Sequence, residues 1–186
     1  DRGSGHCSKD ETIAFAKKLH KMGFRLMIDF HYSDSWADPN KQYKPKAWEN
    51  LNFTDLKKAV YDHTYDVSAA MKKENITPEW VQIGNEIRSG MLFPDGAVPQ
   101  YRQLAALVNE GIRAVRELLP ETKVMIHLDQ GGRYNCIMPW LDSMFNAGML
   151  PIDAIGLSFY SFWHGTFMDL KDTMSRLIKL YNLPVY

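Results

Sequence analysis

Residues 80–86 read Trp-Val-Gln-Ile-Gly-Asn-Glu, an apolar run of strand length that ends directly in an amide and a carboxylic acid. Apolar runs near residues 24–30, 123–128 and 154–159 end in the same way, in polar or aromatic side chains. Those terminal side chains are Asp29 and His31, His127 and Asp129, and Tyr160. Segments with apolar residues at helical spacing follow the runs, and this alternation predicts a parallel α/β sheet.

The polar residues at the strand ends favour a barrel over a doubly wound sheet. In a (β/α)8 barrel the carboxyl ends of the strands form the active-site face. A doubly wound sheet usually carries a glycine-rich phosphate loop after a strand, and no such loop follows any run here. A complete barrel needs ~200 residues or more, whereas this chain has four runs and the start of a fifth near Val185. We therefore expect residues 1–186 to be a single domain, the central part of a catalytic barrel that is incomplete at both ends.

Composition excludes several classes of protein. The 186 residues are 45% hydrophobic and 12% aromatic, which favours a packed core over disorder. The 22 basic and 22 acidic residues cancel, so the chain lacks the positive charge typical of nucleic-acid binders. No apolar run approaches the ~18 residues of a membrane span. Cys7 and Cys136 match no disulfide framework or zinc-ligand spacing, and we expect both to be unpaired.

Two segments carry the candidate chemistry. Glu86, at the end of a barrel strand, is placed to protonate a glycosidic oxygen, and Asn85 could bond a sugar hydroxyl. A structural glutamate at a helix start or in an ion pair is the alternative. Residues 31–39 form a loop rich in short polar groups and rings, in which Trp36 could stack on a sugar and Asp34 and Asp38 could accept hydroxyl hydrogen bonds. The alternative is a turn begun by Asp38, with Trp36 closing the barrel top.

Trp163 and His164 follow the fourth run and could form a second aromatic wall of a cleft. Three histidines, His31, His127 and His164, could converge at a barrel mouth, but no local spacing marks a metal site. We therefore predict no metal.

Residues 29–39, followed by Lys41-Gln42 and by residues 45–48, resemble the signature of glycoside hydrolase family 53, the endo-β-1,4-galactanases. Residues 84–87 and 90–94 are similar to the fourth-strand segment of that family. Two further stretches, 125–129 and 158–165, resemble the ends of its fifth and sixth strands. The resemblance implies a (β/α)8 TIM barrel, of which this chain covers roughly the third strand to the start of the seventh.

The resemblance also implies a function. It implies an endo-acting retaining glycoside hydrolase, an arabinogalactan endo-β-1,4-galactanase, which cleaves β-1,4-galactosidic bonds in the (arabino)galactan side chains of pectin. Glu86 would be the acid/base and Asn85 would contact the sugar 2-hydroxyl. The other residues in cleft-lining segments are His31, Asp34, Trp36, Asp38, His127, Asp129, Tyr160, Trp163 and His164.

Some features of the family fall outside this chain. The nucleophile would be a second glutamate at the end of the seventh strand, where this chain stops. Calcium is possible in a loop that is not present here, and we expect no other cofactor. Phe93 and Ser161 stand where the family commonly has Trp and Pro.

The implied partner is the polysaccharide, and we expect a monomer that is secreted, periplasmic or on the cell surface. The alternatives are a related endo-glycanase acting on mannan, xylan or glucan, an inactive carbohydrate-binding barrel, and a barrel acting on phosphorylated metabolites.

Overall fold

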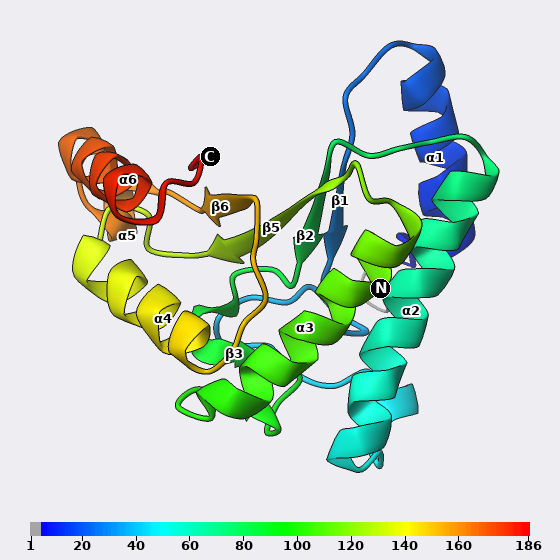
Figure 1. The fold of residues 1–186 in the computed structure, drawn as a ribbon, viewed down its shortest axis with the longest axis horizontal. Helices are drawn as coiled ribbons and strands as arrows, with labels where there is room; N and C mark the ends of the chain where they lie inside the picture. The colour runs from blue at the N-terminus through cyan, green and yellow to red at the C-terminus, as the bar shows by residue number, and fades with distance from the viewer. Residues whose placement is uncertain (1–4) are drawn as a thin grey trace.

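A computed structural model describes residues 5–186 of the chain, and residues 1–4 of the predicted domain lie outside the described residues. Figure 1 shows helices arranged around a small curved sheet. The strands are β1 Met27–Phe30, β2 Trp80–Ile83, β3 Gly90–Met91, β4 Gly96–Ala97, β5 Lys123–Leu128 and β6 Ala154–Leu157. The α-helices are α1 Lys9–Lys21, α2 Phe53–Lys73, α3 Tyr101–Leu118, α4 Tyr134–Asn146, α5 Ser161–His164 and α6 Phe167–Tyr181, with 3-10 turns η1 Lys46–Trp48 and η2 Ile87–Ser89.

The main sheet has the order β1-β2-β5-β6, and every pair in it is parallel. Val185 makes a further parallel bridge to Ile155, in the place where the sequence predicts the next strand to begin. The predicted strands at 80–83 and 123–128 are confirmed. The runs predicted at 24–30 and 154–159 are too long, because pairing starts only at Met27 and ends at Leu157.

Local sequence explains where the helices begin. The Ser8 hydroxyl accepts the backbone N–H of Glu11, and the Glu11 carboxylate accepts from Ser8, which together form a capping box at the start of α1. Thr166 and Asp169 form a second capping box at the start of α6. Among residues 5–186, no helix has the length and apolar character needed to cross a membrane. Both cysteines, Cys7 and Cys136, are free and exposed.

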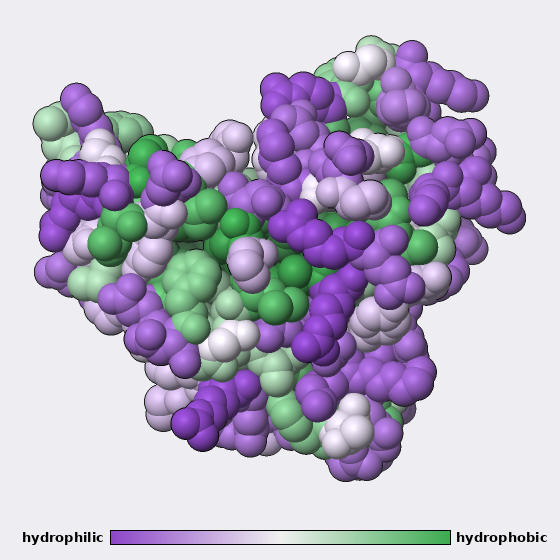
Figure 2. All heavy atoms as spheres, in the orientation of Figure 1, coloured by the Kyte–Doolittle hydropathy of each residue, from purple (hydrophilic) through white to green (hydrophobic). Residues whose placement is uncertain are grey.

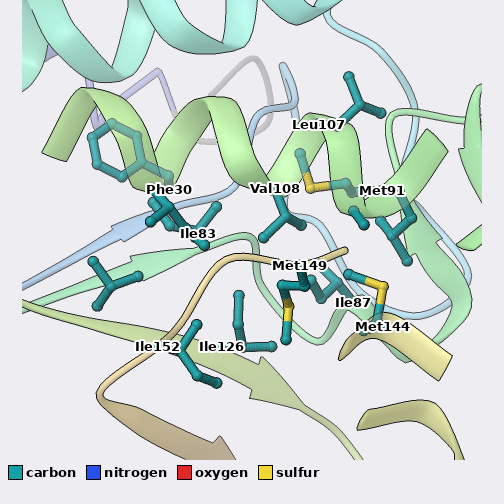
Figure 3. Close-up of a cluster of buried hydrophobic side chains, with 14 of the residues drawn as sticks. Phe30, Ile83, Ile87, Met91, Leu107, Val108, Ile126, Met144, Met149 and Ile152 are labelled. Carbon is teal, nitrogen blue, oxygen red and sulfur yellow. The ribbon is translucent and has the colours of Figure 1, made fainter. Parts of the chain in front are cut away.

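The core lies between the sheet and the surrounding helices. Ile83 and Ile126 of the sheet pack with Leu107 and Val108 of α3, and all four are fully buried (Figure 3). Figure 2 shows apolar side chains gathered over the middle of the visible face, with mostly hydrophilic residues over the α1 and α2 side. Since successive residues of a strand point to opposite faces, Gln82 lies on the face opposite Ile83. The face of the sheet that meets the helices is its outer face, and it is packed with apolar side chains. The opposite, inner face carries polar side chains such as Gln82.

A small hairpin was not predicted from the sequence. Strands β3 and β4 pair antiparallel as Gly90↔Ala97 and Met91↔Gly96. A Cβ atom on Gly90 would lie 2.1 Å from the carbonyl oxygen of Gly96, so this position has no room for a side chain. The hairpin contacts the long loop after β1, where the Phe93 N–H donates to the Gln42 carbonyl at 2.7 Å.

We predict that Gly111→Ala lowers the free energy of unfolding by about 1–3 kcal/mol, because it overpacks a tight contact. A Cβ on Gly111 of α3 would lie 2.9 Å from both Ile83 Cγ2 and the Tyr32 hydroxyl oxygen. At an open helical position the same change stabilises by about 1 kcal/mol, so the sign of the effect is diagnostic. Denaturant unfolding of the complete protein measures it, with exposed Arg102→Ala on the same helix as a near-neutral control. A gain in stability would contradict the tight packing of α3 on β2.

Candidate active site at the carboxyl ends of the strands

Glu86 follows β2 through a sharp backbone turn. Gly84 and Glu86 both have positive φ angles, of 81° and 50°. A Cβ on Gly84 would lie 2.5 Å from Ile87 Cγ2, so the turn requires glycine there. Glu86 itself adopts the left-handed conformation, which is uncommon for a residue with a side chain and is often found at functional sites. The result is a half-buried carboxyl group directly beyond the end of the strand.

Asn85 is 6% exposed and is held on several sides. Its Nδ2 donates to the Ala37 carbonyl at 2.8 Å, and its Oδ1 lies 2.9 Å from His127 Nδ1. Gln42 Nε2 donates to its backbone carbonyl at 2.8 Å. Asn85 therefore ties the loop after β1 to the end of β5, and it fixes the backbone from which Glu86 projects.

Gln82 joins the ends of the first two strands. It is 3% exposed on the inner face, and its Nε2 donates to Asp29 Oδ1 and lies 3.3 Å from Asn85 Oδ1. The other Asp29 oxygen accepts from His31 Nε2 at 2.9 Å. The Ala37 N–H donates to His31 Nδ1 at 3.0 Å, so the ring proton of neutral His31 lies on Nε2.

Arg88 and Asp129 form a bidentate ion pair beside Glu86. Arg88 Nε donates to Asp129 Oδ1 at 2.8 Å, and Nη2 donates to Oδ2 at 3.1 Å. Asp129 is only 3% exposed, and this contact raises the pKa of the Arg88 guanidinium above its usual value. Both carboxylate oxygens of Asp129, one of the predicted sugar-binding residues, therefore accept hydrogen bonds from the Arg88 guanidinium.

His127 lies at the centre of the site. Its Nδ1 faces Asn85 and its Nε2 lies 2.8 Å from the Ser158 hydroxyl oxygen. Burial lowers the pKa of His127, while the nearby carboxylates of Asp29, Glu86 and Asp129 partly oppose that shift. The ring is thus held between β2 and β6 with protein partners on both nitrogens.

The remaining candidates divide between turn, surface and interior. Asp34 Oδ2 accepts the Lys46 N–H at 2.9 Å, and Asp38 Oδ1 accepts the Asn40 N–H at 2.8 Å in a turn. Trp36 is 67% exposed and packs edge-on against His31, with ring centroids 4.9 Å apart. It therefore stands at the surface of the cavity described next.

A cavity of about 560 Å³ lies beside the loop after β1, and Asp29, His31, Asp34 and Trp36 are among its lining residues. The segment after β6, which includes the short helix α5, supplies exposed Tyr160 and Trp163, whose ring centroids are 5.6 Å apart. His164, by contrast, is 5% exposed, and its Nδ1 lies 3.1 Å from the Ser158 carbonyl, so it packs inside this segment.

Sequence reasoning missed four polar residues of this site: Gln42, Gln82, Arg88 and Ser158. Gln82 carries a local signal, as the one amide within an apolar strand, and Gln42 and Ser158 stand in segments that resemble family 53. The partners of Gln42, Arg88 and Ser158 lie 31 to 43 positions away in the chain. Among residues 5–186, no group of three or more acidic, histidine or cysteine side chains is arranged to hold a metal ion.

We predict that Arg88→Met lowers the free energy of unfolding by about 3–5 kcal/mol, because it leaves the buried Asp129 carboxylate without a cation. Arg113→Met breaks an ion pair of similar length, 2.9 Å to Glu110, on the outer surface of α3. That control should cost no more than about 1 kcal/mol. Chemical denaturation of both variants of the complete protein makes the comparison, and equal losses would contradict a buried ion pair at the site.

Comparisons with known proteins agree with this geometry. The family model described as Glycosyl hydrolase family 53 matches residues 1–186. An arabinogalactan endo-beta-1,4-galactanase of Thermothelomyces thermophilus is 34% identical, over 96% of this chain and 55% of its own length. An endo-beta-1,4-galactanase of Bacillus subtilis is 34% identical, over 98% of this chain and 42% of its own.

A solved structure, the Ignisphaera aggregans GH53 catalytic domain, superposes with a TM-score of 0.92 at 41% identity. The match covers 96% of this chain and 49% of that one. The chain thus spans about half the length of the relatives it matches. Its parallel sheet and surrounding helices are part of a TIM barrel, and the chain belongs to glycosyl hydrolase family 53.

Proposed function

We propose that the complete protein is an endo-acting retaining glycoside hydrolase that cleaves β-1,4-galactosidic bonds in (arabino)galactan. The observation that carries this proposal is Glu86, half-buried at the end of β2 in a strained backbone turn that the Asn85 contacts hold in place. Membership of family 53 and the galactanase names of the relatives support the choice of substrate. Galactan side chains of pectin are the natural polymer that fits.

The proposed mechanism is a double displacement. A carboxylate nucleophile supplied by the remainder of the protein attacks the anomeric carbon while the Glu86 carboxylic acid protonates the leaving oxygen. Glu86 then takes a proton from water, which attacks the covalent glycosyl intermediate. Retaining enzymes hold the two carboxyl groups about 5 Å apart. The bidentate contact with Asp129 compensates the charge of Arg88, so the positive charge nearest in sequence to Glu86 is already paired.

Other parts of the site would bind the sugar. One N–H of the Asn85 amide donates to Ala37, and we propose that the second donates to the sugar 2-hydroxyl. The exposed rings of Trp36, Tyr160 and Trp163 offer apolar faces to sugar rings. The reaction needs no cofactor. Because an intact wall polymer is too large to enter a cell, we propose that the enzyme acts outside the cytoplasm as a secreted or surface protein.

We predict that Glu86→Gln lowers kcat on galactan by about 10²–10⁴-fold, the range for loss of a general acid, and leaves KM nearly unchanged. With a dinitrophenyl galactoside as substrate, the rate of the first step should fall much less, because the dinitrophenolate leaving group needs no proton. Added azide should restore turnover by replacing the activated water. Steady-state kinetics on both substrates measure these effects in the complete enzyme.

Glu121→Gln is the matched control, since it makes the same change at an exposed position before β5. Turnover of galactan at the normal rate by Glu86→Gln would contradict the role of Glu86. Release of sugar from mannan, xylan or glucan in place of galactan would reassign the substrate. Binding without cleavage by the unchanged protein would indicate a carbohydrate-binding barrel.

A further inference from the structure

His127 has protein partners on both ring nitrogens. Nδ1 lies 2.9 Å from Asn85 Oδ1 and 3.4 Å from the Glu86 backbone nitrogen, and Nε2 lies 2.8 Å from Ser158 Oγ. A neutral imidazole has one N–H and one lone pair, so only one ring nitrogen can donate. The identity of the partners decides which nitrogen carries the proton.

The Asn85 amide fixes the ring proton on Nδ1. Because the Asn85 Nδ2 donates to the Ala37 carbonyl at 2.8 Å, the atom that faces His127 is the amide oxygen, which can only accept. Gln82 Nε2 approaches the same oxygen as a donor at 3.3 Å. The Glu86 N–H also points to Nδ1, but at 3.4 Å it makes the weaker contact, whereas an unprotonated Nδ1 would set its lone pair against that of Oδ1 at 2.9 Å. Nδ1 therefore donates to Oδ1, the lone pair lies on Nε2, and the Ser158 hydroxyl donates to it.

The backbone around Ser158 holds this hydroxyl in place. The Ser158 N–H donates to the Leu128 carbonyl and its own carbonyl accepts the Gly131 N–H, both at 2.9 Å. His127 pairs in register with Gly156, and a Cβ there would lie 3.4 Å from the ring Cδ2. The serine and the imidazole thus belong to one rigid corner between β5 and β6.

We propose that Ser158 is a positioning residue of the glycosidase reaction, whose hydroxyl keeps His127 neutral and protonated on Nδ1 so that the ring holds Asn85 and the adjoining Glu86. This inference rests on the proposed function. Ser158 acts through His127 and contacts no reacting atom. Its hydroxyl contacts His127 Nε2, the ring nitrogen that does not face Asn85.

The charges around His127 act against the neutral ring that this donor favours. Asp29 and His31 lie at the end of β1, Glu86 and Arg88 follow β2, and Asp129, the partner of Arg88, follows β5. Three carboxylates favour an imidazolium, whereas burial of the ring and a hydroxyl that donates to its lone pair both favour the neutral form. A proton on Nε2 would turn His127 into a cation beside Glu86, which stabilises the carboxylate form of Glu86 and removes the acid that the reaction requires.

The test compares Ser158→Ala with Ser158→Thr in the complete enzyme. Ser158→Ala should lower kcat/KM on galactan about tenfold, the loss expected for one hydrogen bond, and move the basic limb of the pH–rate profile to lower pH. Ser158→Thr keeps the hydroxyl and should restore both. Ser175→Ala, which removes a serine hydroxyl bond to Lys171 on the outer helix α6, should change neither.

A spectroscopic measurement makes the test independent of activity. Long-range ¹H–¹⁵N NMR of the His127 ring should show the Nδ1–H form in the unchanged enzyme, and a raised pKa or a mixture of tautomers in Ser158→Ala. If Ser158→Ala does not fold, Ser158→Cys, which is close in size and a weak donor, should show the same change to a smaller extent.

The outcomes separate the two proposals. An unchanged His127 spectrum in Ser158→Ala would overturn the positioning role even if stability fell, because only packing would then be lost. Equal loss of activity in the alanine and threonine variants would also overturn it. Full activity of Glu86→Gln would instead overturn the proposed function, whatever the state of His127.

Discussion

Parallel register is the constraint on which the whole site depends. Asp29 and Gln82 are register partners, and so are His127 and Gly156, so each pair lies side by side at the same end of the sheet. If the pairing register of a strand shifted by one residue, its inward-facing and outward-facing side chains would exchange places. Such a shift would place Gln82 in the apolar layer beneath α3 and turn Ile83 toward the site. The fully buried Ile83, Ile126 and Val108 therefore fix the chemistry indirectly, by making that shift costly.

The polar groups of the inner face then satisfy one another. Gln82 donates to Asp29, Asn85 bridges Ala37 and His127, and Arg88 pairs with Asp129. Buried polar groups that lack partners are costly, so a network in which each member is bonded can be held rigidly without loss of stability. Rigid placement matters for catalysis because a proton must be delivered to one oxygen in one geometry. In this arrangement the residues around Glu86 serve mainly to hold it.

Much of this could be predicted from the sequence, for identifiable reasons. The longer helices and the strands at residues 80–83 and 123–128 follow from apolar periodicity, a local property, and Glu86 follows from its place after a strand, whereas the four-residue helix α5 is too short for such a pattern. The β3–β4 hairpin could not be predicted in this way, because its strands are two residues long and show no alternation. The pairing of Arg88 with Asp129 joins two separate loops, and the burial of His164 depends on how the segment after β6 folds back on itself. The resemblance to family 53 suggested binding roles for Asp129 and His127, and in the structure both side chains are hydrogen-bonded within the protein.

The loop after β1 and the hairpin after η2 are joined at several points. The Phe93 backbone N–H donates to the Gln42 carbonyl, and the Ser89 hydroxyl donates to the Pro39 carbonyl. Lys44 Nζ lies 2.5 Å from Asp95 Oδ2, and the Tyr43 and Phe93 rings meet edge-on. The two segments are therefore one mechanical unit, although some 50 residues separate them in the chain. An insertion in one of them would lose its partners unless the other changed with it. Any exchange of these segments between relatives, in evolution or in the laboratory, must therefore move both of them together.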